Sequence, residues 1–417
     1  MNPTDEKALP LDKTYLSLAD LFPRPYDKNE VDPYTKTRLI LLCGAEYEAV
    51  WFGHRFHRFC DNQEVRRTLA EIRRGEQQQL KALSMLKPVS ETQLETTISY
   101  EQLAVDLTAE LALREKDEYV KQALDFALLE DFDHLYRYAD LLEMDAGVRA
   151  ERLVGSYTEI MPGRPTVAHP RYPADDVKYP TDYKAAAPET RLHISIITAA
   201  EQQTMNYYMN VAALYPAQRG RELFTEIGMI EEQHVTHYGS LIDPTAGWFE
   251  NLVEHEYTEC YLYYSAAEEE KDPEIRKLFA RFYEMERAHL AAAIRLLKKY
   301  AGKEPEEVLG KDFSFPRPLA LRPHVDYVRG VLKTVTMTAD RESYAELSEL
   351  PDKADFFRYQ KKYLGQAQKA PSHTVIADRI ASRGEDYRFE VKPHPIKILQ
   401  SRTADDISLG RVKTAKE

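Results

Sequence analysis

The sequence predicts an all-α fold in which two tandem four-helix bundles are followed by a long irregular and helical C-terminal extension. Three observations predict it. Apolar residues recur at helical spacing through residues 36–149 and again through 190–302, with few Gly or Pro breaks. The two regions repeat each other in sequence. The stretch between them is rich in proline and tyrosine, as linkers often are.

The composition is that of a folded protein with more than one domain. The chain has 417 residues, of which 43% are hydrophobic and 11% aromatic, so it can hold two or three domains. Its formal net charge of −13 argues against nucleic acid or an anionic membrane as the main partner, because both require basic surfaces. No apolar stretch approaches the ~20 residues that a membrane span requires. We therefore expect no nucleic-acid partner and no membrane partner.

The N-terminus and the cysteines predict a cytoplasmic protein. Residues 1–35 form a polar, proline-containing arm that lacks the basic start and apolar run of a signal peptide. The three cysteines, Cys43, Cys60 and Cys260, are scattered and odd in number. They make neither a disulfide framework nor a CxxC metal site, so a reducing compartment is the simplest interpretation.

The expected domain order follows from these patterns. After the arm comes a first bundle at 36–149, and a linker at 150–189 leads to a second bundle at 190–302. The remaining residues, 303–417, form the extension, in which the pattern predicts a helix near 323–346.

The two regions match without a gap when the chain is shifted by 155 residues. Glu46 then falls on Glu201, and Glu76 falls on Glu231. A second period of 55 residues lies within each region, so each region consists of two similar helix pairs. Further matched pairs are Glu71 with Glu226, Glu101 with Glu256, and His134 with His289 at the first shift, and Glu231 with Glu286 and His234 with His289 at the second.

Each helix pair of the second region carries a lone glutamate and, 30 residues later, the string ExxH. These strings are "EEQH" at 231–234 and "ERAH" at 286–289. Residues i and i+3 share a helix face, ~4.5 Å apart along the axis, so a Glu and a His placed this way can reach one metal ion. A single ExxH is more often a solvated helix face. Two of them in phase with two lone glutamates supply the four carboxylates and two imidazoles of di-iron and di-manganese bundles, and this mixed ligation suits Fe or Mn.

With these motifs the sequence resembles the ferritin-like superfamily, and in particular the rubrerythrin-like di-iron proteins. The stretch "EHEYTECYLYYSAAEEEKDPEIRKLFARFYEMERAHLAAAIRLL" is similar to the second helical hairpin of that family. The resemblance implies two ferritin-like bundles in tandem and a cofactor of two iron ions, or of a mixed Fe/Mn pair. It implies these metal ligands: Glu201, Glu231, His234, Glu256, Glu259, Glu286 and His289.

The same resemblance implies three catalytic residues. Glu259 lies one turn after Glu256 and matches an extra carboxylate that exchanges with a histidine as the metals change redox state; the partner here would be His234. Tyr208 and Tyr263 each follow a lone glutamate by seven residues, and the family suggests tyrosines near the metals that pass a proton or an electron. The alternatives are an outer or solvated acid for Glu259 and ordinary core packing for the two tyrosines.

The first region departs further from the family pattern. Gln79 stands where an imidazole is expected, and a neutral amide is a poor ligand for a transition metal. Asp131 is one methylene shorter than the glutamate that it replaces. We expect a structural copy of the bundle that is metal-free or weakly loaded, or else an altered site, such as a mononuclear one. The residues concerned are Glu46, Glu76, Gln79, Glu101, Asp131 and His134.

The connection between the second and third helices of the second region is short. Only 22 residues separate His234 from Glu256, whereas the family's second and third helices run parallel, so the chain must climb back along the bundle. About 7 extended residues at ~3.3 Å each can cover that climb. Exchange of helical hairpins between subunits or between repeats would relieve the constraint, and a homodimer is compatible with it.

These observations predict a di-iron or Fe/Mn carboxylate oxidoreductase that reduces a small oxidant, hydrogen peroxide or dioxygen. An enzyme is favoured, either a rubrerythrin-like peroxidase or another di-iron oxidoreductase, and Glu259 favours peroxide. Three isolated cysteines cannot form a rubredoxin-type iron site, so an external electron donor is expected. The alternatives are an oxygenase with an organic substrate, a ferroxidase or iron-binding protein without turnover, and a purely structural role.

Overall fold

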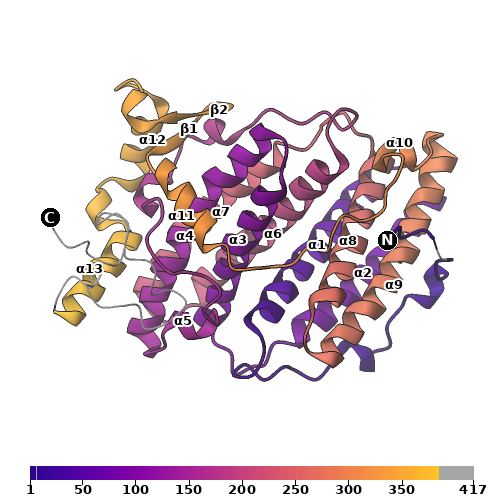
Figure 1. Cartoon of the computed structure of the whole chain (residues 1–417), viewed down its shortest axis with the longest axis horizontal. Helices are drawn as coiled ribbons and strands as arrows, with labels where there is room; N and C mark the ends of the chain where they lie inside the picture. Colours follow the sequence, from indigo (N-terminus) through magenta and orange to yellow (C-terminus); the bar gives the residue numbers. More distant parts are fainter. Residues whose placement is uncertain (6, 385–417) are drawn as a thin grey trace. The chain divides into compact units, whose positions relative to one another are not determined.

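The described residues are mostly helical, with irregular connecting segments and one short β-hairpin (Figure 1). The computed structural model describes residues 1–5 and 7–384, so residues 385–417 of the expected extension lie outside the described residues. The all-α prediction is confirmed. The helices are α1 (Pro33–Phe59), α2 (Gln63–Met85), α3 (Gln93–Arg114), α4 (Glu118–Ala146), α5 (Ala150–Leu153), α6 (Pro188–Leu214), α7 (Gln218–Gly239), α8 (Trp248–Glu269), α9 (Pro273–Leu296), α10 (Glu306–Leu309), α11 (Val325–Val331), α12 (Asp355–Leu364) and α13 (Pro371–Arg383).

The chain forms two compact units, and neither is a continuous stretch of sequence. In unit 1, α1 packs against α2 and α8, and α9 packs against α2 and α8, which closes a bundle of four helices (Figure 1). In unit 2, α3 packs against α4, and α4 packs against α7. Unit 1 comprises residues 1–91, 180–203 and 241–321, and unit 2 comprises residues 92–179, 204–240 and the described residues from 322 onward.

These units differ from the expected domains 36–149 and 190–302. The hairpin α1–α2 shares its bundle with α8–α9, and α3–α4 belongs with α7 and the second half of α6. The expected linker, 150–189, and the expected extension, 303–417, are each divided between the units. The short connector explains the arrangement, because α8 need not climb back beside α7 when the two helices belong to different bundles. Helical hairpins are therefore exchanged between the two repeats.

Helix starts and a buried ion pair fix the helices of unit 1. Asp32 accepts a hydrogen bond from the backbone N–H of Tyr34 at the start of α1, where Pro33 occupies the first helical position. Just past the end of α8, Glu270 accepts hydrogen bonds from Thr35 Oγ1 at 2.8 Å and Arg38 Nε at 3.0 Å. Residues more than 230 positions apart in sequence thus meet in the interior of one unit.

Unit 2 is held by similar caps and by an aromatic cluster. Thr92 and Glu95 form a capping box at the start of α3, and α4 ends at Gly147, whose φ of +65° favours glycine. Inside the unit the Tyr138 ring lies 5.3 Å from the ring of Tyr208 and 4.9 Å from that of Phe224. These rings join α4, α6 and α7 in one apolar layer.

The segment near 323–346 is not the single helix that the sequence predicts. Helix α11 ends at Val331, and the chain then forms β1 (Met337–Asp340) and β2 (Ser343–Glu346). The strands are antiparallel, and Asp340 pairs with Ser343 across a tight turn in which Arg341 has a φ of +53°. Three β-branched residues, "TVT" at 334–336, precede the hairpin; such residues lower helix propensity and favour extended structure.

Two irregular segments are fixed to the bundles by equivalent glutamines. In unit 1, Gln78 accepts a hydrogen bond from the Leu16 N–H at 2.8 Å and donates one to the Leu16 carbonyl at 2.9 Å. In unit 2, Gln233 accepts from the Arg171 N–H and donates to the His169 carbonyl, both at 3.1 Å. Gln78 and Gln233 are 155 residues apart, so the N-terminal arm and the linker occupy corresponding places in the two units.

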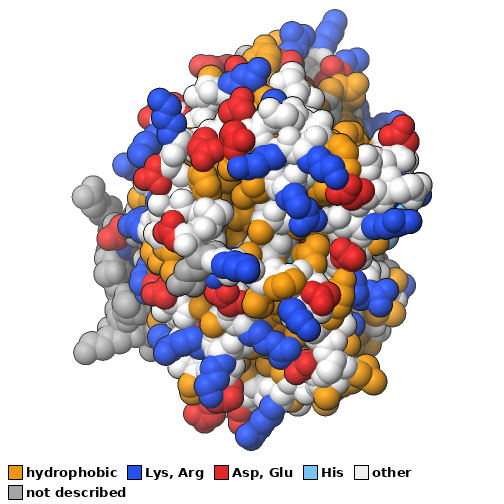
Figure 2. All heavy atoms as spheres, turned by 90° about the vertical axis from the view of Figure 1, so that its right-hand side faces the viewer, with side chains coloured by type: hydrophobic (Ala, Val, Ile, Leu, Met, Phe, Trp, Pro, Cys, Tyr) orange, Lys and Arg blue, Asp and Glu red, His pale blue; other side chains and the backbone are white. Residues whose placement is uncertain are grey.

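Charged side chains of both signs lie on the surface (Figure 2). On the face shown in Figure 2, Lys and Arg are interspersed with Asp and Glu rather than gathered in one patch. Some of these charges form exposed ion pairs, such as Lys277 with Glu274 at 2.7 Å, which contribute little to stability. Within the described residues, no helix is both long enough and apolar enough to span a membrane.

The ion pair between Arg38 and Glu270 provides a test of the hairpin exchange. Substituting Glu270→Gln should lower the free energy of unfolding by about 3 kcal/mol, because Arg38 then keeps a buried charge without its counter-ion. A double-mutant cycle with Arg38→Gln, measured by urea unfolding, should give a coupling well above about 0.5 kcal/mol. The exposed neighbour Glu268→Gln is the control and should change little. Additive effects of the Arg38 and Glu270 substitutions would contradict the packing of α1 against α8.

Candidate metal centres

In each unit one buried glutamate is shared by two groups of buried carboxylates and histidines. In every group the nearest potential ligand atoms lie within 4.8 Å of one another. Glu231 is common to both groups of unit 2, and Glu76 is common to both groups of unit 1. Two cations bridged by one carboxylate need such overlapping ligand sets. The groups are Asp131, Glu201, Glu231 and His234; Glu101, His134 and Glu231; Glu76, Glu256, Glu286 and His289; and Glu46, Glu76 and Glu259.

In unit 2 the shared glutamate lies between two imidazoles. Glu231 Oε1 is 3.0 Å from Nδ1 of His134, and its Oε2 is 3.2 Å from Nδ1 of His234. Asp131 Oδ1 lies 3.2 Å from the same atom of His234. The i, i+3 spacing on α4 and α7 brings each acid and its histidine to one face, so both helices direct an acid–histidine pair inward.

Contacts at Nε2 of His134 and His234 indicate which ring nitrogen of each imidazole faces the carboxylates. His234 Nε2 lies 3.0 Å from Glu130 Oε2, and His134 Nε2 lies 3.1 Å from Nδ1 of His169. Glu130 is ionised, since Arg171 and other cationic neighbours outweigh burial and hold the pKa of this carboxyl well below its usual range. His234 Nε2 therefore donates, and its Nδ1 faces carboxylate oxygen. Two acceptor atoms repel each other, so this contact is favourable only in two cases. Either the imidazole is protonated on Nδ1 as well as on Nε2, or a cation is bound by both Nδ1 and the carboxylate oxygen.

Glu201 is grouped with Asp131, Glu231 and His234, although it lies on α6 just before the boundary after Gln203 and so counts as part of unit 1. This helix is continuous from Pro188 to Leu214, and the chain passes from unit 1 to unit 2 within it. Glu201 is buried, and it lies two turns before Tyr208 on the same helix.

In unit 1 a single imidazole faces several carboxylates. His289 Nδ1 lies 3.1 Å from both Glu76 Oε1 and Glu286 Oε2. Gln79, at the position where a histidine was expected, donates a hydrogen bond to Glu286 Oε1 at 2.5 Å. Gly75 makes room for the imidazole, because a Cβ at this position would lie 2.7 Å from His289 Nε2. Gln79 thus orients a carboxylate and leaves His289 as the one nitrogen donor among the grouped residues of unit 1.

Glu259 gives the clearest indication that unit 1 requires positive charge. Its side chain is buried, and neither of its oxygens has a hydrogen-bond partner among the described residues. Burial, followed by the charges of Glu76 and Glu286, raises the pKa of Glu259 well above its ordinary value. Burial and the same two neighbours also raise the pKa of Glu46. Divalent cations would neutralise these carboxylates, so the residues present fit a pair of metal ions.

The two tyrosines expected near the metals are both in contact with the carboxylate clusters. The Tyr208 hydroxyl donates a hydrogen bond to Glu101 Oε1, and the Tyr263 hydroxyl donates one to Glu46 Oε1. Burial, together with these carboxylates, raises the pKa of both phenols well above 10, so each hydroxyl keeps its proton. Each tyrosine bonds a glutamate of a different helical hairpin from its own.

The structure divides the seven expected ligands between the units. Glu201, Glu231 and His234 belong to the groups that share Glu231, whereas the other four, Glu256, Glu259, Glu286 and His289, belong to those that share Glu76. Glu259 and His234, the expected exchanging pair, are not brought together, because hairpin exchange places them in different units.

Residues of the first repeat complete both centres, although we expected a mainly structural copy. Glu46 and Glu76 contribute to unit 1, and Glu101, Asp131 and His134 contribute to unit 2. The 55-residue period and the short connector were the signals that could have assigned them. His169 and Glu130 contact the imidazoles from outside, and no motif in the sequence singled them out.

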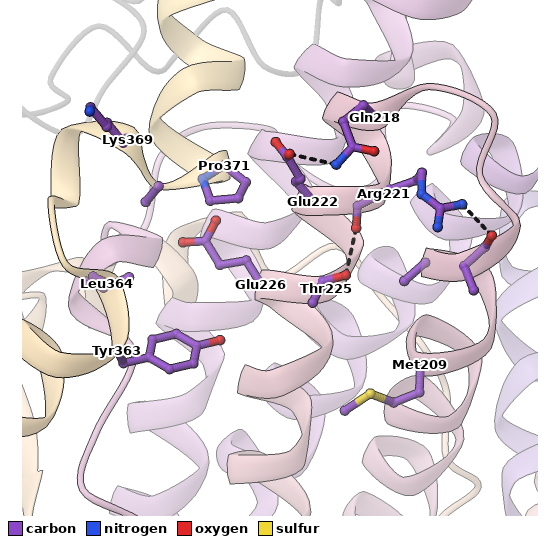
Figure 3. Close-up of a pocket in the computed structure, with 13 residues that line it drawn as sticks. Met209, Gln218, Arg221, Glu222, Thr225, Glu226, Tyr363, Leu364, Lys369 and Pro371 are labelled. Carbon is purple, nitrogen blue, oxygen red and sulfur yellow. Dashed lines mark hydrogen bonds between the residues drawn. The ribbon is translucent and has the colours of Figure 1, made fainter.

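The stretch "EIGMIEEQHVTHYG" on α7 combines three different roles. Glu231 and His234 face the cluster, whereas His237 Nε2 lies 3.0 Å from the Tyr344 hydroxyl. Glu226 accepts hydrogen bonds from the N–H and the hydroxyl of Ser372, at 2.7 and 2.9 Å, and so anchors α13. Glu226 also lines a surface pocket of about 650 Å³ between α6, α7 and the segment around Pro371 (Figure 3). None of the residues lining this pocket belongs to a carboxylate–histidine group.

Comparison with known proteins identifies no relative: no family model matches the chain, and no curated protein or solved structure matches it. The assignment of the two clusters therefore depends on their residues and geometry.

Removal of a shared glutamate tests whether the clusters bind metal. Glu76 belongs to both groups of unit 1, so Glu76→Ala should lower the metal content by about two ions per chain, provided each shared carboxylate bridges two cations. The measurement is elemental analysis of protein loaded with Mn²⁺ or Fe²⁺ and then desalted. Glu71→Ala, an exposed acid on the same helix, is the matched control. Equal metal content in both variants would exclude a centre at Glu76.

The pKa shifts predict how pH affects the stability of the metal-free protein. The pKa values of Glu46, Glu256 and Glu259 are raised above the ordinary 4.5, and that of His289 is raised because Glu286 and Glu76 outweigh burial. Each of these four groups therefore holds more protons in the folded than in the unfolded state at pH values between its ordinary pKa and its raised pKa. The free energy of unfolding should fall as the pH rises from about 5 to 8. Bound cations should abolish this loss, which melting curves with EDTA or Mn²⁺ can measure. The same decrease in melting temperature with pH in EDTA and in Mn²⁺ would contradict this prediction.

Proposed function

We propose that the protein is a ferritin-like, di-metal carboxylate oxidoreductase that reduces a small oxidant, with hydrogen peroxide preferred over dioxygen. The observation that carries the proposal is the sharing of Glu231 and of Glu76 between two ligand groups in each unit. Buried pairs of cations bridged by carboxylates typically carry out redox chemistry with small oxidants.

The donor set favours Fe or Mn as the resident metal. Carboxylate oxygens dominate both clusters, and imidazole nitrogen is present in each. Such ligation suits Fe and Mn, whereas Zn sites that rely on thiolates need cysteines, and the free cysteines lie outside the groups. Unit 2 offers two imidazoles and unit 1 offers one, so both units are candidates for a dinuclear centre.

A pair of such cations, when bound, would supply two electrons to one peroxide molecule, which takes up two protons and becomes two water molecules. An external donor would then return one electron to each cation. Glu259 supports peroxide as the oxidant. Its two oxygens have no hydrogen-bond partner among the described residues, so this carboxylate is free to change its position as the charge at the centre changes. The electron donor has to be a separate protein or cofactor, because no cysteine cluster accompanies the centres.

The tyrosines hold protons at the edge of each centre. The hydroxyl of Tyr263 is bonded to Glu46, and that of Tyr208 is bonded to Glu101. Each hydroxyl can donate its proton to the carboxylate oxygen that it already bonds. General acids placed in this way contribute about 10²- to 10⁴-fold to the rate of a reaction that consumes protons.

Peroxide reduction can be tested with protein loaded anaerobically with Fe²⁺. Stopped-flow absorbance should show rapid oxidation of two Fe²⁺ per peroxide, with no evolution of oxygen, and slow reaction with O₂. The combined change Tyr208→Phe and Tyr263→Phe should slow the peroxide reaction at least about tenfold while leaving metal content unchanged.

Tyr264→Phe is the control, because this tyrosine packs on Phe315, outside the ligand groups. Peroxide consumption no faster than that of free Fe²⁺ would refute the proposal. Rapid O₂ uptake with slow peroxide reaction would favour an oxygenase or a ferroxidase.

A further inference from the structure

The linker brings three buried polar residues to the outer side of the unit 2 centre. Arg164, His169 and Arg171 are each at most 1% exposed, although they come from a Pro- and Tyr-rich segment with little regular structure. Burial of such residues is costly unless they have specific partners. Neither the proposed reaction nor any sequence motif uses them.

A chain of hydrogen bonds connects His169 to one imidazole of the centre. His169 Nε2 lies 2.6 Å from the carbonyl oxygen of Arg164, and a carbonyl can only accept, so this nitrogen carries hydrogen. Its Nδ1 lies 3.1 Å from His134 Nε2. A neutral His169 can only accept at Nδ1, so His134 Nε2 is the donor. His134 Nδ1 is then the nitrogen that faces Glu231.

A second chain fixes the other imidazole in the same way. His234 Nε2 lies 3.0 Å from Glu130 Oε2, and the other oxygen of this carboxylate forms an ion pair with Arg171, so the imidazole is the donor. Arg171 NH1 donates to Glu130 Oε1 at 2.5 Å, and its Nε donates to Asp176 at 2.7 Å. His234 Nδ1 is again the nitrogen directed at the carboxylates of the cluster.

The linker itself is held in place beside the ligands. Asp133, next to His134 on α4, accepts hydrogen bonds from the N–H and the hydroxyl of Thr166, at 2.8 and 2.6 Å. Gln233, next to His234 on α7, binds the backbone of His169 and Arg171. The position of His169 is therefore set by the same two helices that carry the histidines of the centre.

We propose that the linker is an outer part of the unit 2 metal centre, in which His169 fixes His134, and the Glu130–Arg171 pair fixes His234, with hydrogen on Nε2 and Nδ1 presented to a cation. The inference rests on the proposed metal binding but not on the proposed redox reaction. His169 is a positioning residue, because it contacts a ligand residue and not the cation. Partners of this kind orient ligating imidazoles and raise their basicity.

Unit 1 lacks this support and serves as an internal reference. Its N-terminal arm is bound by Gln78, the counterpart of Gln233, but the arm places the backbone of Leu16 there. His289 Nε2 has no hydrogen-bond partner among the described residues and lies against Gly75. Changes at His169 should therefore leave metal binding at His289 unaffected.

The test uses the full chain loaded anaerobically with Co²⁺, which is paramagnetic. Proton NMR of the unaltered protein in H₂O should show strongly shifted, exchangeable N–H signals from the metal-bound imidazoles. His169→Phe, which keeps a ring but removes the acceptor, should abolish the His134 signal and weaken Co²⁺ binding at one position about 10- to 100-fold. His169→Asn places an amide oxygen near the former Nδ1 and should restore both signal and affinity to within about threefold, since it again offers an acceptor.

His237→Phe is the control for the loss of a buried imidazole in the same unit, because its Nε2 contacts Tyr344 rather than a ligand residue. Equal Co²⁺ affinities and unchanged N–H signals in His169→Phe would overturn the inference alone. The inference would also be overturned if His169→Phe and His169→Asn weakened Co²⁺ binding equally while His237→Phe did not. In that case a hydrogen-bond acceptor at position 169 would not be what supports His134. No Co²⁺ binding by the unaltered protein would overturn the metal centre and the inference together.

Discussion

The sharing of one buried glutamate between two ligand groups is the constraint on which both units depend. Glu231 and Glu76 each lie where helices from two hairpins meet, and each is surrounded by further acids that water does not reach. Packed apolar side chains cannot stabilise such a concentration of negative charge, which requires protons, imidazolium or metal cations at its centre. The helices must therefore stay in register about these points, and the caps, the aromatic layer and the Arg38–Glu270 pair serve to keep them there.

The sequence predicted the helices and the inward-facing acids because both depend on local spacing. The strings "EEQH" and "ERAH" and the lone glutamates at 30-residue separations are properties of single hairpins, and a hairpin forms in the same way whatever it packs against. The choice of partner hairpin is a long-range property. The four hairpins are similar enough that more than one pairing places acids in a core, and only the connector from His234 to Glu256 distinguishes them. Assigning the ligands to one continuous bundle therefore placed each predicted ligand with only some of the neighbours that the structure gives it. That assignment left out Glu46, Glu76, Glu101, Asp131 and His134.

The residues that hold the ligands from outside could not be predicted from the sequence, for a different physical reason. Glu130 resembles any charged residue on a helix until Arg171 is seen to approach it at 2.5 Å, and His169 lies in a segment without periodicity. The matching positions of Gln78 and Gln233 could be obtained from the 155-residue repeat, but an exposed glutamine and one that binds a backbone segment look alike in sequence. Irregular segments bury polar atoms only when such partners exist, so the two glutamines account for the ordered path of the arm and the linker.

The two centres differ in a compensating manner. In unit 2 the second ligand group contains His134, whereas the equivalent residue of unit 1 is Gln79, which donates its hydrogen bond to Glu286. Glu259 takes the free place in the second group of unit 1, so that group consists of carboxylates alone. Replacing an imidazole with a carboxylate adds one negative charge and shifts the donor chemistry towards harder cations such as Mn²⁺. The loss of a histidine in one repeat and the gain of an acid in another therefore meet in one unit only because the hairpins are paired as the structure pairs them: Gln79 bonds Glu286, and Glu259 joins the other group that shares Glu76.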